Sequence, residues 1–418
     1  MKSEVKAMRP EPKQLRLAYP TRKPTAPRPD RGSRPRTLRV AGLFAGVGGL
    51  ELGLTRAGHE TGLLCEIDAG ARAVLAARFP DIPCAPDVRE LKTLPKGTEL
   101  LVGGFPCQDL SQAGKTAGIE GSRSGLVGEV FRLVRTTRVP FVLLENVPFM
   151  LQLSRGRALE VIVATLEDLG YRWAYRVVDT RAFGLPQRRE RVFLLASLDE
   201  DPRRVLFADD AIEPEDVPQG RVACGFYWTE GVRGLGWAVD AVPTLKGGST
   251  VGIPSPPAIV LPSGSIVKPD IRDAERMQGF EVDWTKPAES VVKRGYRWHL
   301  VGNAVTVDVA GWLGERLALP GEYDDEGDSP LLAGRPWPRA AWNLGQGRFA
   351  ADVSAWPVRR TRMHLQEFLR FPTEPLSAKA TAGFLSRARS GSLRFPPGFL
   401  ADVERHLGRM REELAAAV

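Results

Sequence analysis

Short apolar runs alternate with amphipathic segments between residues 38 and 197. The apolar runs predict buried strands at 38–44, 60–67, 99–102, 141–144, 171–178 and 191–196, and the amphipathic segments predict helices at 49–57, 69–79, 126–136 and 158–169. Strands that alternate with helices in this way form a mostly parallel sheet with helices on both faces. We therefore predict an α/β fold for this part of the chain.

The alternation stops after residue 197. Residues 198–270 are rich in Gly, Pro and Trp, and regular patterning returns only at 273–280 and 302–309. Residues 320–357 combine an acidic patch with many Gly and Pro, which predicts a linker or an extended wrap. The last segment, 363–417, is patterned as several helices with arginines interspersed.

The net charge of +8 comes from the N-terminal tail. Residues 1–37 hold 11 of the 58 Lys and Arg but only 3 of the 50 Asp and Glu, so the remaining chain is neutral as a whole. Prolines and a weak apolar pattern predict a disordered tail. It is either a solubilising extension or a polycation that adds salt-sensitive phosphate contacts. We expect no membrane span and no secretory signal, and cysteines without a C-x-x-C pair fit a reducing cytoplasm.

A glycine-rich turn, Phe44 to Gly49, follows the first predicted strand and opens a helix. Its F-x-G-x-G-G pattern lets the backbone approach a ligand closely but differs from the dinucleotide fingerprint. Glu66 follows 20 residues after Gly46 and can accept both ribose hydroxyls of a nucleoside. Asp87, at the third turn, can accept an adenine amino group. Together these residues predict a site for an adenosyl cofactor that lacks a pyrophosphate.

A second group of residues carries the chemistry. Cys107 follows two glycines and a proline directly after the predicted strand 99–102, a setting that displays a thiol on a loop. Glu145 follows the strand 141–144, so it should lie at the same carboxyl edge of the sheet, where ligands bind. Arg189 and Arg191 are two residues apart at the entry to a strand, which places both on one face. Two guanidiniums on one face suit phosphate or base-carbonyl recognition.

These motifs, in this order, resemble those of the cytosine-C5 DNA methyltransferase family of the prokaryotic type. The similar elements are the cofactor loop Phe44–Gly49, the nucleophile loop Gly104-Phe105-Pro106-Cys107-Gln108, the glutamate motif Glu145-Asn146-Val147, the Q-x-R-x-R element 187–191, the R-x-Q-G-F element 276–280 and the closing Gly302-Asn303-Ala304-Val305. The resemblance covers roughly residues 38–316. Six ordered motifs make a chance match far less plausible than any single one would.

The resemblance implies a Rossmann-like fold that uses S-adenosylmethionine and acts on double-stranded DNA, without a metal. Cys107 would attack C6 of a flipped-out cytosine and activate C5 for methylation, and Glu145 would hold or protonate N3. Arg189 would help place the base at its O2, and Arg191 would support the loop and nearby acids. Gln108 and Ser111 would close over the base. The cofactor residues would be Phe44, Gly46, Gly48, Gly49, Glu66, Ile67, Asp87, Val88, Pro106, Leu126, Asn303 and Val305.

The resemblance also divides the chain. We expect a disordered tail at 1–37, a catalytic domain at 38–197 to which 271–316 returns, a small target-recognition region and connector at 198–270, and a linker with a helical C-terminal extension at 317–418. The C-terminal arginines indicate either an accessory DNA contact or a packing or partner-docking module. The expected protein is a bacterial, cytoplasmic enzyme, monomeric on DNA, that serves a restriction-modification or phage-defence system.

Two other functions share these motifs. An RNA cytosine-C5 methyltransferase of the transfer-RNA type would carry a Cys-Phe-Thr signature, which Cys224-Gly225-Phe226 does not match. A catalytically silent DNA-binding homologue would lack the nucleophile or the glutamate, whereas Cys107 and Glu145 are both present. The sequence therefore favours an active DNA methyltransferase.

Overall fold

The computed structural model describes residues 35–105, 125–214, 221–248, 255–332 and 334–416. Most of the predicted disordered tail lies outside these ranges. The largest feature is a ten-stranded sheet with the order β14-β16-β15-β6-β8-β5-β4-β1-β2-β3. Its strands are β1 (Arg39–Leu43), β2 (Glu60–Cys65), β3 (Cys84–Ala85), β4 (Leu100–Gly104), β5 (Phe141–Asn146), β6 (Arg172–Asp179), β8 (Glu190–Ser197), β14 (Ser329–Pro330), β15 (Ala340–Asn343) and β16 (Arg348–Ala350).

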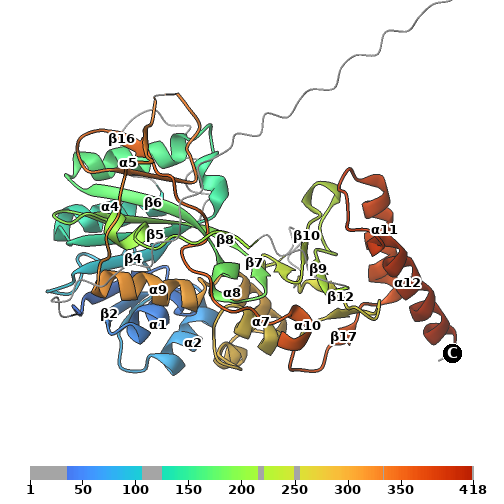
Figure 1. Cartoon of the computed structure of the whole chain (residues 1–418). Helices are drawn as coiled ribbons and strands as arrows, with labels where there is room; N and C mark the ends of the chain where they lie inside the picture. The colour runs from blue at the N-terminus through green and yellow to red at the C-terminus, as the bar shows by residue number, and fades with distance from the viewer. Residues whose placement is uncertain (1–34, 106–124, 215–220, 249–254, 333, 417–418) are drawn as a thin grey trace, which may run out of the picture.

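Helices cover both faces of this sheet, as the alternating pattern predicted. Figure 1 shows α5 above the sheet and α1 and α9 below it. The apolar side chains of α4 and α5 pack on one face and those of α1 and α9 on the other. Within β4, Leu101 faces the first group whereas Leu100 and Val102 face the second. These helices are α1 (Gly49–Arg56), α2 (Ala69–Arg78), α4 (Leu126–Thr137), α5 (Arg157–Asp168) and α9 (Val307–Ala318).

The parallel strands end at one edge, and that edge positions the site. β1 pairs in parallel with β2 and β4, and β4 pairs in parallel with β5. Gly104 lies opposite Glu145 in this register, and Leu43 lies opposite Gly103. The glycine turn after β1, the end of β4 and the glutamate at the end of β5 are therefore neighbours. The α/β, Rossmann-like fold class is confirmed.

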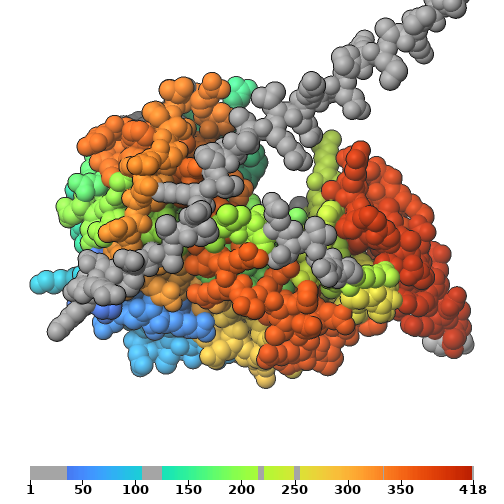
Figure 2. Space-filling model, in the orientation of Figure 1, coloured from blue at the N-terminus to red at the C-terminus, as the bar shows by residue number. Residues whose placement is uncertain are grey.

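A second domain stands beside the large sheet. Its five-stranded sheet has the order β10-β9-β12-β13-β17, and helices α11 and α12 pack against it. Phe226 of β9 and Phe384 of α11 have ring centroids 4.4 Å apart. Figure 2 shows the two domains as separate lobes, with the orange-red residues before β17 crossing this face from one to the other. The elements are β9 (Cys224–Phe226), β10 (Trp237–Val239), β12 (Ala258–Val260), β13 (Ile266–Lys268), β17 (Glu374–Pro375), α11 (Ala378–Ser390) and α12 (Phe399–Ala416).

Two features differ from the expected division of the chain. Residues 317–357 do not serve only as a linker, because β15 pairs antiparallel with β6 and carries β16 and β14 with it. The C-terminal helices are not a separate extension either, because β17 pairs with β13 and the helices complete the core of the second domain. Both differences arise from strand pairings between segments far apart in the sequence.

Shorter elements complete the two domains and the segments between them. None of the helices in the described ranges combines the length and apolarity needed to cross a bilayer. These shorter elements are β7 (Gln187–Arg188), β11 (Val242–Pro243), α6 (Arg203–Leu206), α7 (Ile271–Met277), α8 (Arg297–Asn303), α10 (Leu365–Phe368), and the 3-10 helices η2 (Pro148–Leu151), η3 (Thr180–Phe183), η4 (Val232–Gly234), η5 (Lys286–Ser290) and η6 (Arg294–Tyr296).

Candidate active site

A cavity of about 580 Å³ lies at the carboxyl edge of the parallel strands. It is lined by residues that follow β1, β2, β4 and β5, by the start of β8, and by α8. The structure thus brings the predicted cofactor turn and three of the predicted catalytic residues, Glu145, Arg189 and Arg191, to one cavity. The predicted residues that line the cavity are Phe44, Gly46, Glu66, Ile67, Asp87, Val88, Leu126, Glu145, Arg189, Arg191 and Asn303.

The glycine turn and Glu66 hold each other in place. Phe44 and Gly46 both have a φ of 54°, a left-handed conformation that the chain adopts to bend under the cavity. The Gly46 amide donates to Glu66 Oε2 at 2.7 Å, and the Asp68 amide donates to Glu66 Oε1 at 2.8 Å. Each carboxylate oxygen has a second lone pair to offer. Glu66 is therefore a fixed acceptor at the wall of the cavity.

Three predicted cofactor residues are not among those that line the cavity. A side chain at Gly48 would overlap the Phe79 ring, and one at Gly49 would overlap the Val305 carbonyl oxygen. These glycines let α1 pack closely against its neighbours, and Val305 is buried in that contact. Close packing thus accounts for both glycines, and Gly48 in addition has a φ of 83°, a left-handed conformation like those of Phe44 and Gly46.

Asp87 lies at the cavity with its carboxylate already partnered. Arg89 Nη2 lies 2.6 Å from Asp87 Oδ2, and Arg89 Nε lies 3.0 Å from Oδ1. These hydrogen bonds lower the pKa of Asp87, so the group is an anion at neutral pH. Ile67 is 64% exposed at the rim, whereas Val88 is buried.

Glu145 and Arg191 form an ion pair inside the cavity. Arg191 Nε lies 2.9 Å from Glu145 Oε1, and both side chains are mostly buried. Burial lowers the pKa of the Arg191 guanidinium, and the charge of Glu145 opposes this change. A side chain at Gly104 would come within 2.9 Å of Glu145 Oε2, so only glycine leaves the carboxylate free on that side.

Arg189 lines the cavity, and its guanidinium is held by backbone carbonyls. It is 1% exposed, and its Nη1 donates to the carbonyls of Leu245 and Gly302 at 3.1 Å. Its Nη2 donates to the Ala304 carbonyl at 2.7 Å. These hydrogen bonds join the connector to the closing motif, and the contact of Arg189 with a base oxygen stays a prediction.

Most of the nucleophile loop lies outside the described residues, including Pro106, Cys107 and Gln108, as does Ser111. Its first described neighbour is Phe105, whose carbonyl accepts a hydrogen bond from Asn146 Nδ2 at 3.1 Å. Asn146 thus ties the start of the nucleophile loop to the strand that carries Glu145. The sequence motif included Asn146, but this function was not predicted.

The sequence did not lead us to a group of polar residues at the cavity beside α8. It includes His299 of α8 and Asp68, both of which line the cavity. His299 Nδ1 lies 2.6 Å from the Gly247 carbonyl and donates to it, and Asn303 Nδ2 donates to His299 Nε2 at 3.0 Å. The spacing of four residues between His299 and Asn303 on a helix was the signal that could have found this pair. Tyr296, stacked on His299, donates to Asp68 Oδ2.

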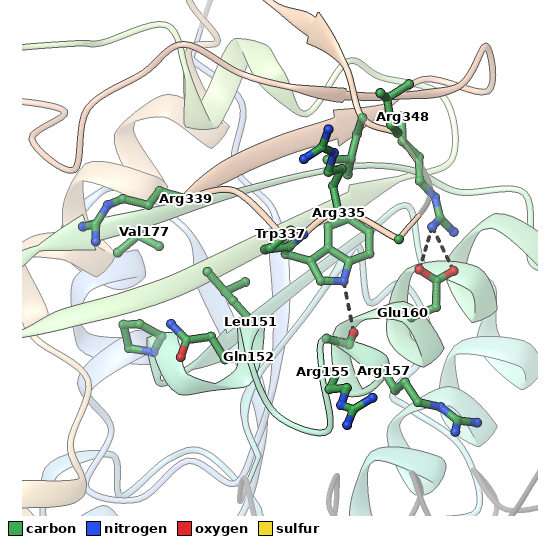
Figure 3. A pocket seen from close by; sticks show the side chains of 16 residues that line it. Leu151, Gln152, Arg155, Arg157, Glu160, Val177, Arg335, Trp337, Arg339 and Arg348 are labelled. Atoms are coloured by element: carbon green, nitrogen blue, oxygen red, sulfur yellow. Dashed lines mark hydrogen bonds and ion pairs between the residues drawn. The ribbon is translucent and has the colours of Figure 1, made fainter. Parts of the chain in front are cut away.

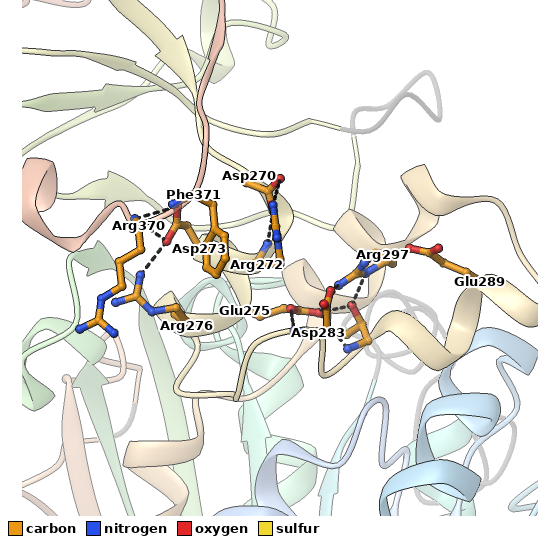
Figure 4. A network of polar contacts seen from close by, with 11 residues as sticks. Asp270, Arg272, Asp273, Glu275, Arg276, Asp283, Glu289, Arg297, Arg370 and Phe371 are labelled. Atoms are coloured by element: carbon orange, nitrogen blue, oxygen red, sulfur yellow. Dashed lines mark hydrogen bonds and ion pairs between the residues drawn. The ribbon is translucent and has the colours of Figure 1, made fainter.

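The R-x-Q-G-F element supports the site without entering it. Gln278 Nε2 donates to the Val301 carbonyl at 2.9 Å, which holds α8 in place. Figure 4 shows the polar network around the element, in which Asp273 accepts from Arg276 and from the backbone amides of Arg370 and Phe371. Asp273 is fully buried, so the network fixes the segment that leads into the second domain.

The fold and the site define a methyltransferase of the α/β class. The family model described as "C-5 cytosine-specific DNA methylase" matches residues 38–222. The Type II methyltransferase M2.BsuMI of Bacillus subtilis (strain 168) is 47% identical over 393 residues, which cover 90% of this chain and 100% of that relative. The chain therefore belongs to the C-5 cytosine-specific DNA methylase family, and it is a DNA (cytosine-5-)-methyltransferase.

Other relatives match smaller parts. The Type II methyltransferase M.BanI of Aneurinibacillus aneurinilyticus is 37% identical over 175 residues, 40% of each chain. Among solved structures, the S. pombe Dnmt2 methyltransferase aligns with a TM-score of 0.47 at 15% identity, covering 67% of this chain and 98% of that one. The match to the Bacillus relative thus covers more than twice the share of this chain that the M.BanI match covers.

Proposed function

We propose that the chain transfers a methyl group from S-adenosylmethionine to C5 of a cytosine flipped out of duplex DNA, through a covalent bond between Cys107 and C6. The observation that carries this proposal is one cavity that is lined both by the Gly46–Glu66 turn and by the Glu145–Arg191 pair. A cofactor and a base bound in this cavity would meet at the carboxyl edge of the sheet.

The residues present fit an adenosyl group. Glu66 is held by two backbone amides and retains lone pairs for ribose hydroxyls, and Asp87 offers an anionic acceptor. S-adenosylmethionine, when bound, supplies an electrophilic methyl group on a sulfonium. Leu126 provides apolar wall next to these acceptors. The role of the protein is then to hold the cofactor and to make C5 of the base nucleophilic.

The chemistry on the base belongs to the chain's own residues. We infer that the Cys107 thiolate adds to C6, which raises the electron density at C5 so that C5 accepts the methyl group. Glu145 holds or protonates N3 and so stabilises the negative charge that the addition places on the ring. Arg191 orients Glu145, and Arg189 helps place the base at its O2. After methylation, loss of the C5 proton to a base restores the ring and expels the Cys107 thiolate.

The second domain is the proposed target reader. The base can reach the cavity only when it leaves the helical stack, at a cost of a few kcal/mol. A domain that grips the duplex beside the cavity would stabilise this state. We propose that residues 221–268 and 374–416 together read the DNA sequence, and that the enzyme acts as a monomer to protect host DNA in a restriction-modification or phage-defence system.

Covalent trapping tests the proposal. Duplex DNA with 5-fluorocytosine has no C5 proton to lose, so the wild-type protein with S-adenosylmethionine should form a denaturation-resistant adduct. Cys107→Ser should form none. Cys84→Ser is the matched control because this half-buried thiol is not among the cavity-lining residues, and it should trap as the wild type does. An adduct that persists in Cys107→Ser would contradict the mechanism.

Expression in a methylation-free host identifies the target. Bisulfite sequencing should show 5-methylcytosine in one sequence context for the wild type and none for Glu145→Gln. Purified transfer RNA should take no label from the wild-type enzyme, which separates the proposal from the RNA alternative.

A further inference from the structure

A second cavity, of about 680 Å³, lies next to the active site. One wall is the segment from η2 to α5, and the other is the loop between β14 and β15. Val147 lines the active-site cavity, whereas the next residue, Pro148, lines this one. The two cavities are therefore neighbours at the point where β5 ends.

Arginines dominate the second cavity. Five of them line it, and two of these are neutralised: Arg348 by Glu160 and Glu167, and Arg339 by Glu190. The other three are Arg155, Arg157 and Arg335. Within the described residues, no carboxylate lies within ion-pair distance of any of these three guanidiniums. Three positive charges around one cavity repel one another unless a bound anion lies between them and offsets the repulsion.

The arginines are presented by a defined piece of structure. Ser154, Arg155 and Gly156 have φ values of 53°, 59° and 83°, a left-handed turn that non-glycine residues rarely adopt. Trp337 holds this turn, because its Nε1 donates to the Gly156 carbonyl at 3.0 Å and a side chain at Gly156 would come within 2.7 Å of the indole. Figure 3 shows Trp337 between the turn and Arg335.

We infer that this cavity binds backbone phosphates of the substrate duplex beside the flipped cytosine. The inference rests on the proposed function, since it assumes DNA at the neighbouring active site. A guanidinium presents a planar fork that matches phosphate oxygens, and successive phosphates of a strand offer anions at the spacing of neighbouring side chains. Residues 329–350, which complete the cavity, follow the closing motif in the sequence and add three strands to the large sheet. They lie away from the second domain (Figure 1), so they would lengthen the surface that contacts the duplex.

The test compares two triple variants of the full chain. Arg155→Asn, Arg157→Ala and Arg335→Ala remove the unpaired charges, and asparagine is chosen at 155 because it tolerates a left-handed backbone. The control removes Lys96, Arg135 and Arg172, which are exposed at the opposite edge of the sheet. Binding to a fluorescein-labelled duplex that carries the methylated site is followed by anisotropy over a series of salt concentrations, and thermal unfolding checks both variants.

The first variant should bind DNA roughly 10- to 100-fold more weakly near physiological salt, with the slope of log K against log salt reduced by about 2. Its KM for DNA should rise while kcat at saturating DNA stays near that of the wild type. The control should match the wild type in all of these. A wild-type affinity and slope in the first variant, or weaker binding with an unchanged slope, would overturn the inference.

The same series separates this inference from the proposed function. If wild-type protein transfers no labelled methyl group to DNA, the proposed function fails. If the wild type transfers it and both triple variants bind and methylate equally well, only the phosphate site fails. Loss of binding to another protein, with DNA binding intact, would assign the cavity to a protein partner and would also overturn it.

Discussion

Glu51 tests whether burial in the fold keeps a carboxyl group protonated. It lies in the first turn of α1 and is fully buried, and neither carboxyl oxygen has a hydrogen-bond partner among the described residues. It fits against β1 only because residue 42 is glycine, where any side chain would overlap the Glu51 carboxyl group. Burial raises the pKa of Glu51 to about 7, and the nearby charge of Glu66 adds to this effect.

The magnitude follows from linkage. In the unfolded chain Glu51 ionises near the ordinary pKa of 4.5, whereas in the folded protein it stays protonated up to about 7. A pKa that is raised on folding contributes stability below the unfolded value, and this contribution is lost as the pH rises through the folded value. The difference corresponds to about 3 kcal/mol at 1.36 kcal/mol for each pH unit. Glu51→Gln cannot ionise, so it should not show this loss.

Urea unfolding followed by circular dichroism, from pH 5 to pH 8, measures the effect. The free energy of unfolding of Glu51→Gln relative to wild type should increase by about 2–3 kcal/mol across this range. Glu60→Gln, at an exposed position of β2, is the control and should differ from the wild type by a constant amount. Parallel curves for Glu51→Gln and wild type would refute the reasoning, because they would mean that Glu51 ionises alike in both states.

Three further changes test other parts of the structure. Arg191→Lys removes the planar group paired with Glu145 and should lower methyl transfer to DNA by about 100-fold without a change in the thermal unfolding midpoint, as labelled S-adenosylmethionine would show. Gly49→Ala should destabilise the protein by about 1–3 kcal/mol in urea through the clash with Val305, whereas Gly62→Ala, in open space, should not. Burial lowers the pKa of His59, so the contribution of His59 to stability should decrease as the pH drops below about 6.5, and the free energy of unfolding of His59→Gln relative to wild type should rise over that range.

The sequence was sufficient for the parts of the fold that depend on local patterns. The buried strands β1, β4 and β5 were predicted from apolar runs, and the period of two correctly placed Arg189 and Arg191 on the same side of the chain. The role of Arg189 could not be predicted in the same way. Its hydrogen-bond partners are carbonyls at 245, 302 and 304, which no pattern near residue 189 reveals.

The added strands and the C-terminal helices escaped prediction for a related reason. β14 has two residues and β15 has four, too few for a period to emerge, and Pro330 argues against a strand. What makes them strands is the exposed edge of β6, a partner more than 150 residues earlier in the sequence. Likewise, the helical pattern after residue 363 was recognised, but the sheet on which these helices pack was not.

The second domain also sets an order of events during protein synthesis. Its strands β9, β10, β12 and β13 leave the ribosome well before β17, α11 and α12, the last of the described elements to be made. Domains generally fold as units once their residues are available. A nascent chain can therefore complete the cavity of the large domain before α11 and α12, which cover the apolar face of the second sheet, have been synthesised. A ribosome that terminates before residue 374 would release a methyltransferase domain with an unfinished second domain and an exposed apolar sheet, a product suited to proteolysis rather than to unselective methylation.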